Sequence, residues 1–191
     1  MVDWRTNPQE LPPYDFIMNK VLEFTKPGVN PEQVESLMNM IAYHETGPQQ
    51  RMLPEAIQII NGGQEGPGRG LFQYELQTLG GSGAGRTAMN NLLAAYGEDY
   101  DQLPRWAKKY FDTNNEWNYP NPSGDVDFSD LTEEQQKVLF LADKLMDKNV
   151  KLGDIGTVSD STWWAKYHHK GGGSTEKFDS SRRSYLNNSI R

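Results

Sequence analysis

Glu45 is the residue of this chain best placed for proton chemistry, because it ends a stretch with a helical pattern. Reading back from it, Ile41, Leu37 and Val34 fall at helical spacing, so the carboxyl continues a buried stripe. Partial burial and the negative end of the helix dipole both disfavour the charged form. We therefore expect a carboxyl with raised proton affinity, which a general acid working near neutral pH requires.

A glycine-rich stretch follows Glu45 and leads into the run Gly70-Leu71-Phe72-Gln73. Residues 46–85 contain no long periodic segment, and a loop of that length inside a compact domain is usually functional or disordered. The apolar side chains of Leu71, Phe72 and Tyr74 predict that this loop is pinned to the core.

Clear helix starts flank this region of the sequence. Asn30 as N-cap, Pro31 at the first helical position and Gln33 at the third form a capping-box pattern, and this helix should run to His44 or Glu45. Thr132 with Gln135 predicts the same start for a later helix. Further helices are expected at about 14–25, 87–96, 103–111, 161–170 and 180–189, with a second loop over 112–130 and no strand of two-residue period.

The sequence therefore predicts a mainly α protein with long Gly-rich loops around a groove. At 191 residues the chain suits one domain, 1–191. We divide it into an N-terminal extension with one helix (1–29), a core of about 30–175, and a basic C-terminal helix (176–191).

Composition excludes several classes of function. A net charge of -7 argues against a general nucleic-acid binder, and the lack of cysteine excludes a disulfide framework or a thiolate nucleophile. No apolar run resembles a signal peptide or approaches the ~20 residues of a membrane span, so we expect no membrane insertion. No cofactor or metal is expected: His44, His168 and His169 form no His-Glu-x-x-His pattern, and adjacent helical histidines diverge by about 100°.

The order helix, Glu45-Thr46-Gly47, then Gly70-Leu71-Phe72-Gln73 resembles the lysozyme-like superfamily, most of all lytic transglycosylases and goose-type lysozymes. Those proteins carry a catalytic Glu at a helix end, followed by a small polar residue. A later Gly-Leu-Met-Gln-type run lines their sugar groove, and an Ala-x-Tyr-Asn-x-Gly-like segment comes after further helices. The run Ala165–Gly173 stands where that segment would be. The resemblance covers about residues 31–175.

The resemblance implies a role for each matching residue. Glu45 would be the catalytic acid and base, with Thr46 beside it. Phe72, Gln73 and Tyr74 would line the sugar cleft. Tyr167 would lie near Glu45 and hold it or a substrate oxygen.

Three departures from the family pattern qualify these roles. The loop between Glu45 and Gly70 is longer than expected, Phe72 replaces the usual Met, and His168 replaces the usual Asn. Such divergence is typical of a bacteriophage wall-degrading protein, made in the host cytoplasm and acting on the cell wall either as a free endolysin or within a virion, where other virion proteins would be partners.

The implied reaction is cleavage of the MurNAc–GlcNAc β-1,4 bond of peptidoglycan. A muramidase would usually need a second carboxylate, for which Glu65 and Glu75 are candidates, whereas a lytic transglycosylase works with one Glu; we favour the latter. The alternative is a non-catalytic virion or wall-binding protein that keeps the scaffold. A zinc-dependent amidase is rejected for want of ligands.

Overall fold

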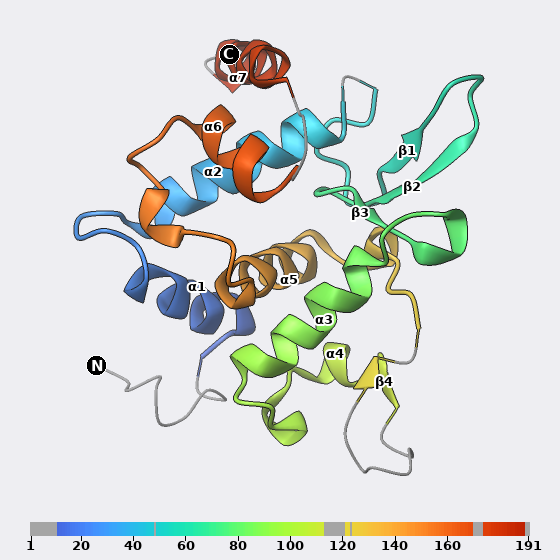
Figure 1. Ribbon diagram of the computed structural model, residues 1–191, viewed down its shortest axis with the longest axis vertical. Coiled ribbons are helices and arrows are strands. Elements are labelled where there is room, and N and C mark those ends of the chain that lie inside the picture. Colours follow the sequence, from blue (N-terminus) through green and yellow to red (C-terminus); the bar gives the residue numbers. More distant parts are fainter. Residues whose placement is uncertain (1–10, 48, 113–120, 123, 170–173, 190–191) are drawn as a thin grey trace.

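The computed structural model describes residues 11–47, 49–112, 121–122, 124–169 and 174–189 (Figure 1). Over these residues the chain is mainly helical, as the sequence predicts. The main helices are α1 (Pro13–Glu23), α2 (Pro31–Glu45), α3 (Ala84–Ala95), α4 (Arg105–Lys108), α5 (Glu133–Met146), α6 (Asp160–Tyr167) and α7 (Thr175–Ser189). Short 3-10 turns cover Gln77–Leu79, Tyr100–Gln102, Phe128–Asp130 and Leu152–Asp154.

Helix α5 forms the centre of the protein. Nine consecutive residues, from Gln136 to Lys144, are buried, so this helix is enclosed on all sides. Helices α1 and α3 pack against it, while α2 packs with α6 and α7 in a neighbouring layer (Figure 1). This packing puts the carboxyl ends of α2, α5 and α6 on the borders of a single cleft.

Both predicted capping boxes are confirmed. At the start of α2, the Gln33 backbone N–H donates to Asn30 Oδ1 at 3.0 Å, and the Asn30 N–H donates to Gln33 Oε1 at 3.0 Å. Thr132 and Gln135 make the same reciprocal pair at α5. Each box satisfies two N–H groups that the first helical turn cannot pair, which fixes where the helix begins.

The expectation of no strands is wrong. The stretch after α2 contains a three-stranded antiparallel sheet in the order β1 (Ile57–Ile59), β2 (Glu65–Arg69) and β3 (Tyr74–Glu75). A second sheet pairs β4 (Phe111–Asp112) with β5 (Asn121–Pro122). The three-stranded sheet holds the Gly70–Gln73 run in the tight connection between β2 and β3.

The helix predicted at 103–111 forms only in part, as α4 over Arg105–Lys108. Tyr100–Gln102 forms a 3-10 turn, α4 is only four residues long, and Phe111 enters a strand. Pro104 explains the break, because it cannot donate the N–H of a continuing helix and pushes the residue before it, Leu103, into an extended conformation. The C-terminal helix α7 starts at Thr175, close to the start of the 176–191 segment and before the helix start expected near residue 180.

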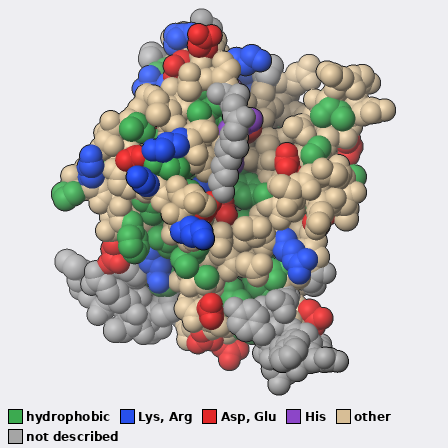
Figure 2. All heavy atoms as spheres, in the orientation of Figure 1, with side chains coloured by type: hydrophobic (Ala, Val, Ile, Leu, Met, Phe, Trp, Pro, Cys, Tyr) green, Lys and Arg blue, Asp and Glu red, His purple; other side chains and the backbone are tan. Residues whose placement is uncertain are grey.

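Acidic and basic side chains are intermixed over the face in Figure 2 and do not gather in one patch of either sign. Among the described residues, no helix has both the length and the apolar character that crossing a membrane requires.

Candidate active site

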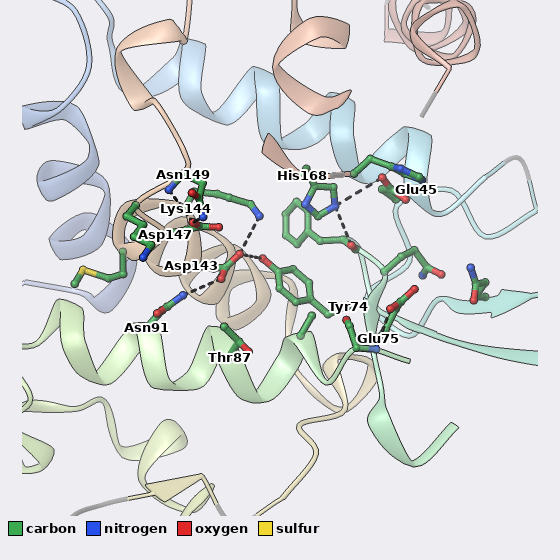
Figure 3. A pocket seen from close by; sticks show the side chains of 18 residues that line it. Glu45, Tyr74, Glu75, Thr87, Asn91, Asp143, Lys144, Asp147, Asn149 and His168 are labelled. Atoms are coloured by element: carbon green, nitrogen blue, oxygen red, sulfur yellow. Dashed lines mark hydrogen bonds and ion pairs between the residues drawn. The ribbon is translucent and has the colours of Figure 1, made fainter. Parts of the chain in front are cut away.

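Glu45 is the last residue of α2, and its side chain is 15% exposed. Ile41, Leu37 and Val34, one to three turns earlier, are buried, so the carboxyl does continue the buried stripe of the helix. The exposed part of the carboxyl faces a cleft of about 800 Å³ (Figure 3). Ligand pockets in proteins commonly measure roughly 300–1,000 Å³.

Two residues of the α6 end hold the Glu45 carboxyl. The Trp164 indole N–H donates to Glu45 Oε1 at 2.5 Å. His168 Nε2 lies 3.6 Å from the same oxygen and 3.1 Å from the carbonyl oxygen of Phe72. Because a carbonyl only accepts hydrogen bonds, Nε2 carries a proton and donates to Phe72.

Burial raises the pKa of Glu45, and this effect outweighs the Trp164 hydrogen bond and the charges of His169 and Lys144, which lower it. The direction agrees with the expectation from the sequence. Its cause is the apolar surrounding, which disfavours the carboxylate. Glu45 therefore keeps its proton to higher pH than an exposed glutamate does.

His44, the residue before Glu45, adds no positive charge to the site near neutral pH. His44 packs edge-on against Trp164, with ring centroids 4.6 Å apart, and its Nδ1 lies 3.0 Å from Ser181 Oγ of α7. Burial, together with the charges of His169 and Lys177, lowers the pKa of His44 to about 4. Because it is neutral, His44 does not stabilise the carboxylate form of its neighbour Glu45 by charge.

The structure brings five of the predicted residues to the same cleft as Glu45: Phe72, Gln73, Tyr74, Glu75 and His168. Phe72 is buried and stacks on Phe140 with centroids 4.2 Å apart. Gln73 has a left-handed backbone (φ 49°), and its side-chain amide donates to the Gly70 carbonyl at 2.7 Å.

Gln136 of α5 pins the Gly70–Gln73 run to the core, as the apolar residues in the loop predict. Its Oε1 accepts the Leu71 N–H at 2.7 Å, and its Nε2 donates to the carbonyl of Pro54 at 2.8 Å. Gly70 has a φ of 71°, and a Cβ there would come within 2.4 Å of Gln136 Oε1. Only glycine fits this position without displacing Gln136.

Tyr167 does not reach Glu45. Its hydroxyl donates to Asp154 Oδ2, and its ring packs against Trp163. Residues four apart share one face of a helix, so Trp164 and His168 face Glu45, while Trp163 and Tyr167 point about 100° away from that face. The role that the resemblance implies for Tyr167 is therefore not available to it, and His168 occupies the place beside Glu45.

Thr46 and Glu65 also lie outside the cleft lining. Thr46 Oγ1 donates to the Ala42 carbonyl at 2.7 Å and accepts the Met52 N–H at 2.9 Å, so it joins the end of α2 to the following loop. The Glu65 side chain is 62% exposed and pairs with Arg69 at 3.3 Å. Of the two proposed second carboxylates, only Glu75 borders the cleft.

A polar network at the other end of the cleft was not foreseen from the sequence. Asp143 accepts hydrogen bonds from Tyr74 Oη at 2.8 Å, Asn91 Nδ2 at 3.0 Å and Lys144 Nζ at 2.9 Å (Figure 3). Burial and the neighbouring Asp143 raise the pKa of the Tyr74 hydroxyl, so it acts as a donor. Asp143 is one of the nine consecutive buried residues of α5, so helical spacing alone does not set it apart from its neighbours.

In the part of the chain that the structure describes, no three His, Cys, Asp or Glu side chains gather as a metal site would need. No known protein family, curated protein or solved structure matches this chain. The site is therefore defined by its own geometry: a buried, protonatable carboxyl at one end of a polar cleft and a buried Asp–Lys pair at the other.

Proposed function

We propose that this protein is a peptidoglycan-degrading glycosidase that cleaves the MurNAc–GlcNAc β-1,4 bond, with Glu45 as general acid and then base. The observation that carries the proposal is a glutamate with a raised pKa on the wall of a sugar-sized cleft, next to the Gly70–Gln73 run. An enzyme that breaks a glycosidic bond near neutral pH needs a carboxyl that is still protonated when substrate binds.

The reaction follows from this one proton. Glu45 donates it to the glycosidic oxygen while that oxygen leaves the sugar carbon, on which positive charge develops. The resulting Glu45 carboxylate then removes a proton from the nucleophile that attacks this carbon. If the nucleophile is the sugar's own 6-hydroxyl, the product is a 1,6-anhydro sugar; if it is water, the product is a reducing end.

The Trp164 indole has a defined part in this cycle. Its N–H donates to Glu45 Oε1 at 2.5 Å, which favours the carboxylate that forms after proton transfer. Burial favours the acid that must be present before it. Glu45 is thus balanced between the two protonation states that an acid–base catalyst alternates between.

The proposal extends to a lysozyme-like fold and to a bacteriophage wall-degrading role. Two features support the resemblance to lytic transglycosylases: Glu45 ends α2, and Phe72 and Gln73 of the Gly70–Gln73 run line the cleft. We favour the single-Glu transglycosylase route over the muramidase route, with peptidoglycan as the binding partner.

Clearing of purified bacterial cell walls tests the proposal. The parent protein should clear them, and Glu45→Gln, which keeps an acceptor for Trp164 but has no acidic proton, should lose roughly 10²–10⁴-fold in rate. Glu55→Gln, at an exposed position outside the cleft, is the matched control. Equal inactivity of parent and Glu45→Gln on walls of several chemistries would favour the non-catalytic scaffold. Mass spectrometry of the fragments separates anhydro from reducing ends.

A further inference from the structure

Lys144 is a buried lysine on the cleft wall. Its side chain is only 5% exposed, although it borders the cleft together with Glu45. Its aliphatic part and ammonium lie against Phe140 and Tyr74, with Nζ 5.3 and 5.9 Å from their ring centroids. A lysine is rarely this buried unless it is paired, so the groups around Lys144 indicate its role.

The Lys144 ammonium has more N–H donors than the described residues around it have acceptors. An ammonium group carries three N–H donors. Among the described residues, its one hydrogen-bond acceptor is Asp143 Oδ2, at 2.9 Å. Because Lys144 borders the cleft, a bound group that reaches its ammonium can accept the remaining donors.

Asp143 also accepts hydrogen bonds from residues other than Lys144. Tyr74 donates to the same oxygen, and Asn91 donates to the other one. These neutral donors satisfy the carboxylate independently of Lys144 and fix its position. Asp143 thus acts as a rigid anchor that holds the ammonium against the cleft.

Lys144 and Glu45 border the same cleft. The charge of Lys144 lowers the pKa of Glu45, so the two groups interact electrostatically. Figure 3 shows Lys144 with Asp143 on one side of the view and Glu45 with His168 on the other, with Tyr74 between them. A ligand that pairs with Lys144 would therefore extend toward Glu45.

We propose that Lys144 binds a carboxylate carried by the saccharide, and so determines which sugar of the strand lies beside Glu45. This rests on the proposed function. In peptidoglycan such a carboxylate has two sources: the lactyl group of a muramic acid without its peptide, or the peptide stem. Because the carboxyls of Glu45, Glu75 and Asp147 also border the cleft, a cation on its wall favours an anionic sugar there.

Binding is measured by NMR titration with the Glu45→Gln protein, which leaves the ligands intact. Three disaccharide probes share one backbone: N-acetylglucosaminyl-N-acetylmuramic acid, the same disaccharide bearing a stem peptide, and di-N-acetylchitobiose, which has no carboxylate. We expect a carboxylate probe to bind roughly 10- to 100-fold more tightly than chitobiose. Preference for the first probe identifies the lactyl source, and preference for the second identifies the stem.

Lys144→Met should remove this preference while chitobiose binding stays unchanged. Lys144→Arg should retain most of it, and Lys148→Met, at an exposed lysine on the same cleft, should not affect it. Because Lys144→Met leaves Asp143 without its cation and can unfold the protein, a second readout uses an unchanged Lys144. The Cε resonance of Lys144 should shift with a carboxylate probe and not with chitobiose.

Equal binding of all three probes, a preference that survives in Lys144→Met, or a Lys144 resonance that stays still would each overturn the proposal. So would failure of both carboxylate probes to bind. These results are separate from wall clearing. A protein that clears walls through Glu45 without a Lys144-dependent preference lacks only the carboxylate site, and one that shows the preference without clearing lacks only the enzymatic activity.

Discussion

The two ends of the cleft each hold a largely buried carboxyl, but the groups around them differ. The Glu45 side chain is 15% exposed and the Asp143 side chain 10%. Glu45 accepts one hydrogen bond from a neutral indole, with His168 at 3.6 Å. Asp143 accepts three, one of them from an ammonium group.

Burial alone therefore does not separate a carboxyl suited to proton transfer from one engaged in a hydrogen-bond network. Glu45 has one oxygen without a hydrogen bond from the described residues, so it can exchange a proton with a substrate. Both oxygens of Asp143 are occupied by protein donors, so its role is to hold Tyr74, Asn91 and Lys144 in place. Substitutions at the two ends should therefore have different effects: on activity at Glu45 and on stability at Asp143.

The largest expected effect is on activity at the Glu45 end. Glu45→Asp keeps the charge but shortens the side chain by one methylene, which moves the carboxyl away from Trp164 and from the bond to be cleaved. We expect a loss of about 100-fold or more in the rate of wall clearing. Glu55→Asp is the control, and a near-normal rate for Glu45→Asp would contradict a positioned acid.

At the Asp143 end the large effect should be on stability. Asp143→Ala leaves the Lys144 ammonium buried without its counter-ion and removes the acceptor of Tyr74, so the free energy of unfolding should fall by about 3–5 kcal/mol. Urea denaturation followed by circular dichroism measures it. A loss below about 1 kcal/mol would mean that the network is not a structural anchor.

Glu45→Gln should behave in the opposite way in the same denaturation experiment. Because burial raises the pKa of Glu45, the folded protein holds this proton to higher pH than the unfolded chain does. The contribution of Glu45 to stability is then full below the unfolded pKa and is lost as pH rises through the folded pKa. At neutral pH, Glu45→Gln should therefore be as stable as the parent or more so.

Much of the fold follows from local signals in the sequence. The capping boxes at Asn30 and Thr132 fix the starts of α2 and α5 from a few residues each. The sheet could not be predicted in this way, because three of the five residues of β2 are Gly or Pro, which have low strand propensity. At Gly66, a Cβ would lie 2.3 Å from Gln58 Oε1 of β1, so a larger residue there would displace the Gln58 side chain. That requirement exists only once the strands are paired.

Some residues of the site can also be predicted from local sequence signals, and others cannot. The buried stripe of α2 is sufficient to single out Glu45, whereas no stripe singles out Asp143, because α5 is buried over nine consecutive residues. Helical spacing also separates His168 from Tyr167, since only the former shares a face with Trp164. That Asn91, Tyr74 and Lys144 meet at Asp143 depends on the packing of α3 and β3 against α5, which no local pattern reveals.

A smaller effect should follow from removing the indole donor at the reactive end. Trp164→Phe deletes the N–H that lowers the pKa of Glu45, so this pKa should rise further. Activity of the parent should fall as pH climbs past the raised pKa of its acid, and in Trp164→Phe this fall should move to higher pH. We expect a rate loss of about tenfold or less at the optimum, since one hydrogen bond is removed.

Trp163→Phe is the matched control for this pH profile. Among the described residues, the Trp163 indole N–H has no hydrogen-bond partner, and its ring packs on Tyr167, away from Glu45. The profile of Trp163→Phe should coincide with that of the parent. A Trp164→Phe profile that moves to lower pH, or does not move, would contradict the role of the indole.

The smallest effect is expected at Glu75, and it tests whether the reactive end works with one carboxyl or two. Glu75 borders the cleft, and its Oε2 accepts the Ser82 N–H at 3.0 Å, a bond that Glu75→Gln can keep through its amide oxygen. With a single-Glu mechanism, Glu75→Gln should lose less than about tenfold in wall clearing, similar to Glu65→Gln on the exposed side of β2. A loss of about 100-fold in Glu75→Gln alone, together with reducing ends in the products, would instead assign Glu75 as the second carboxylate of a hydrolase.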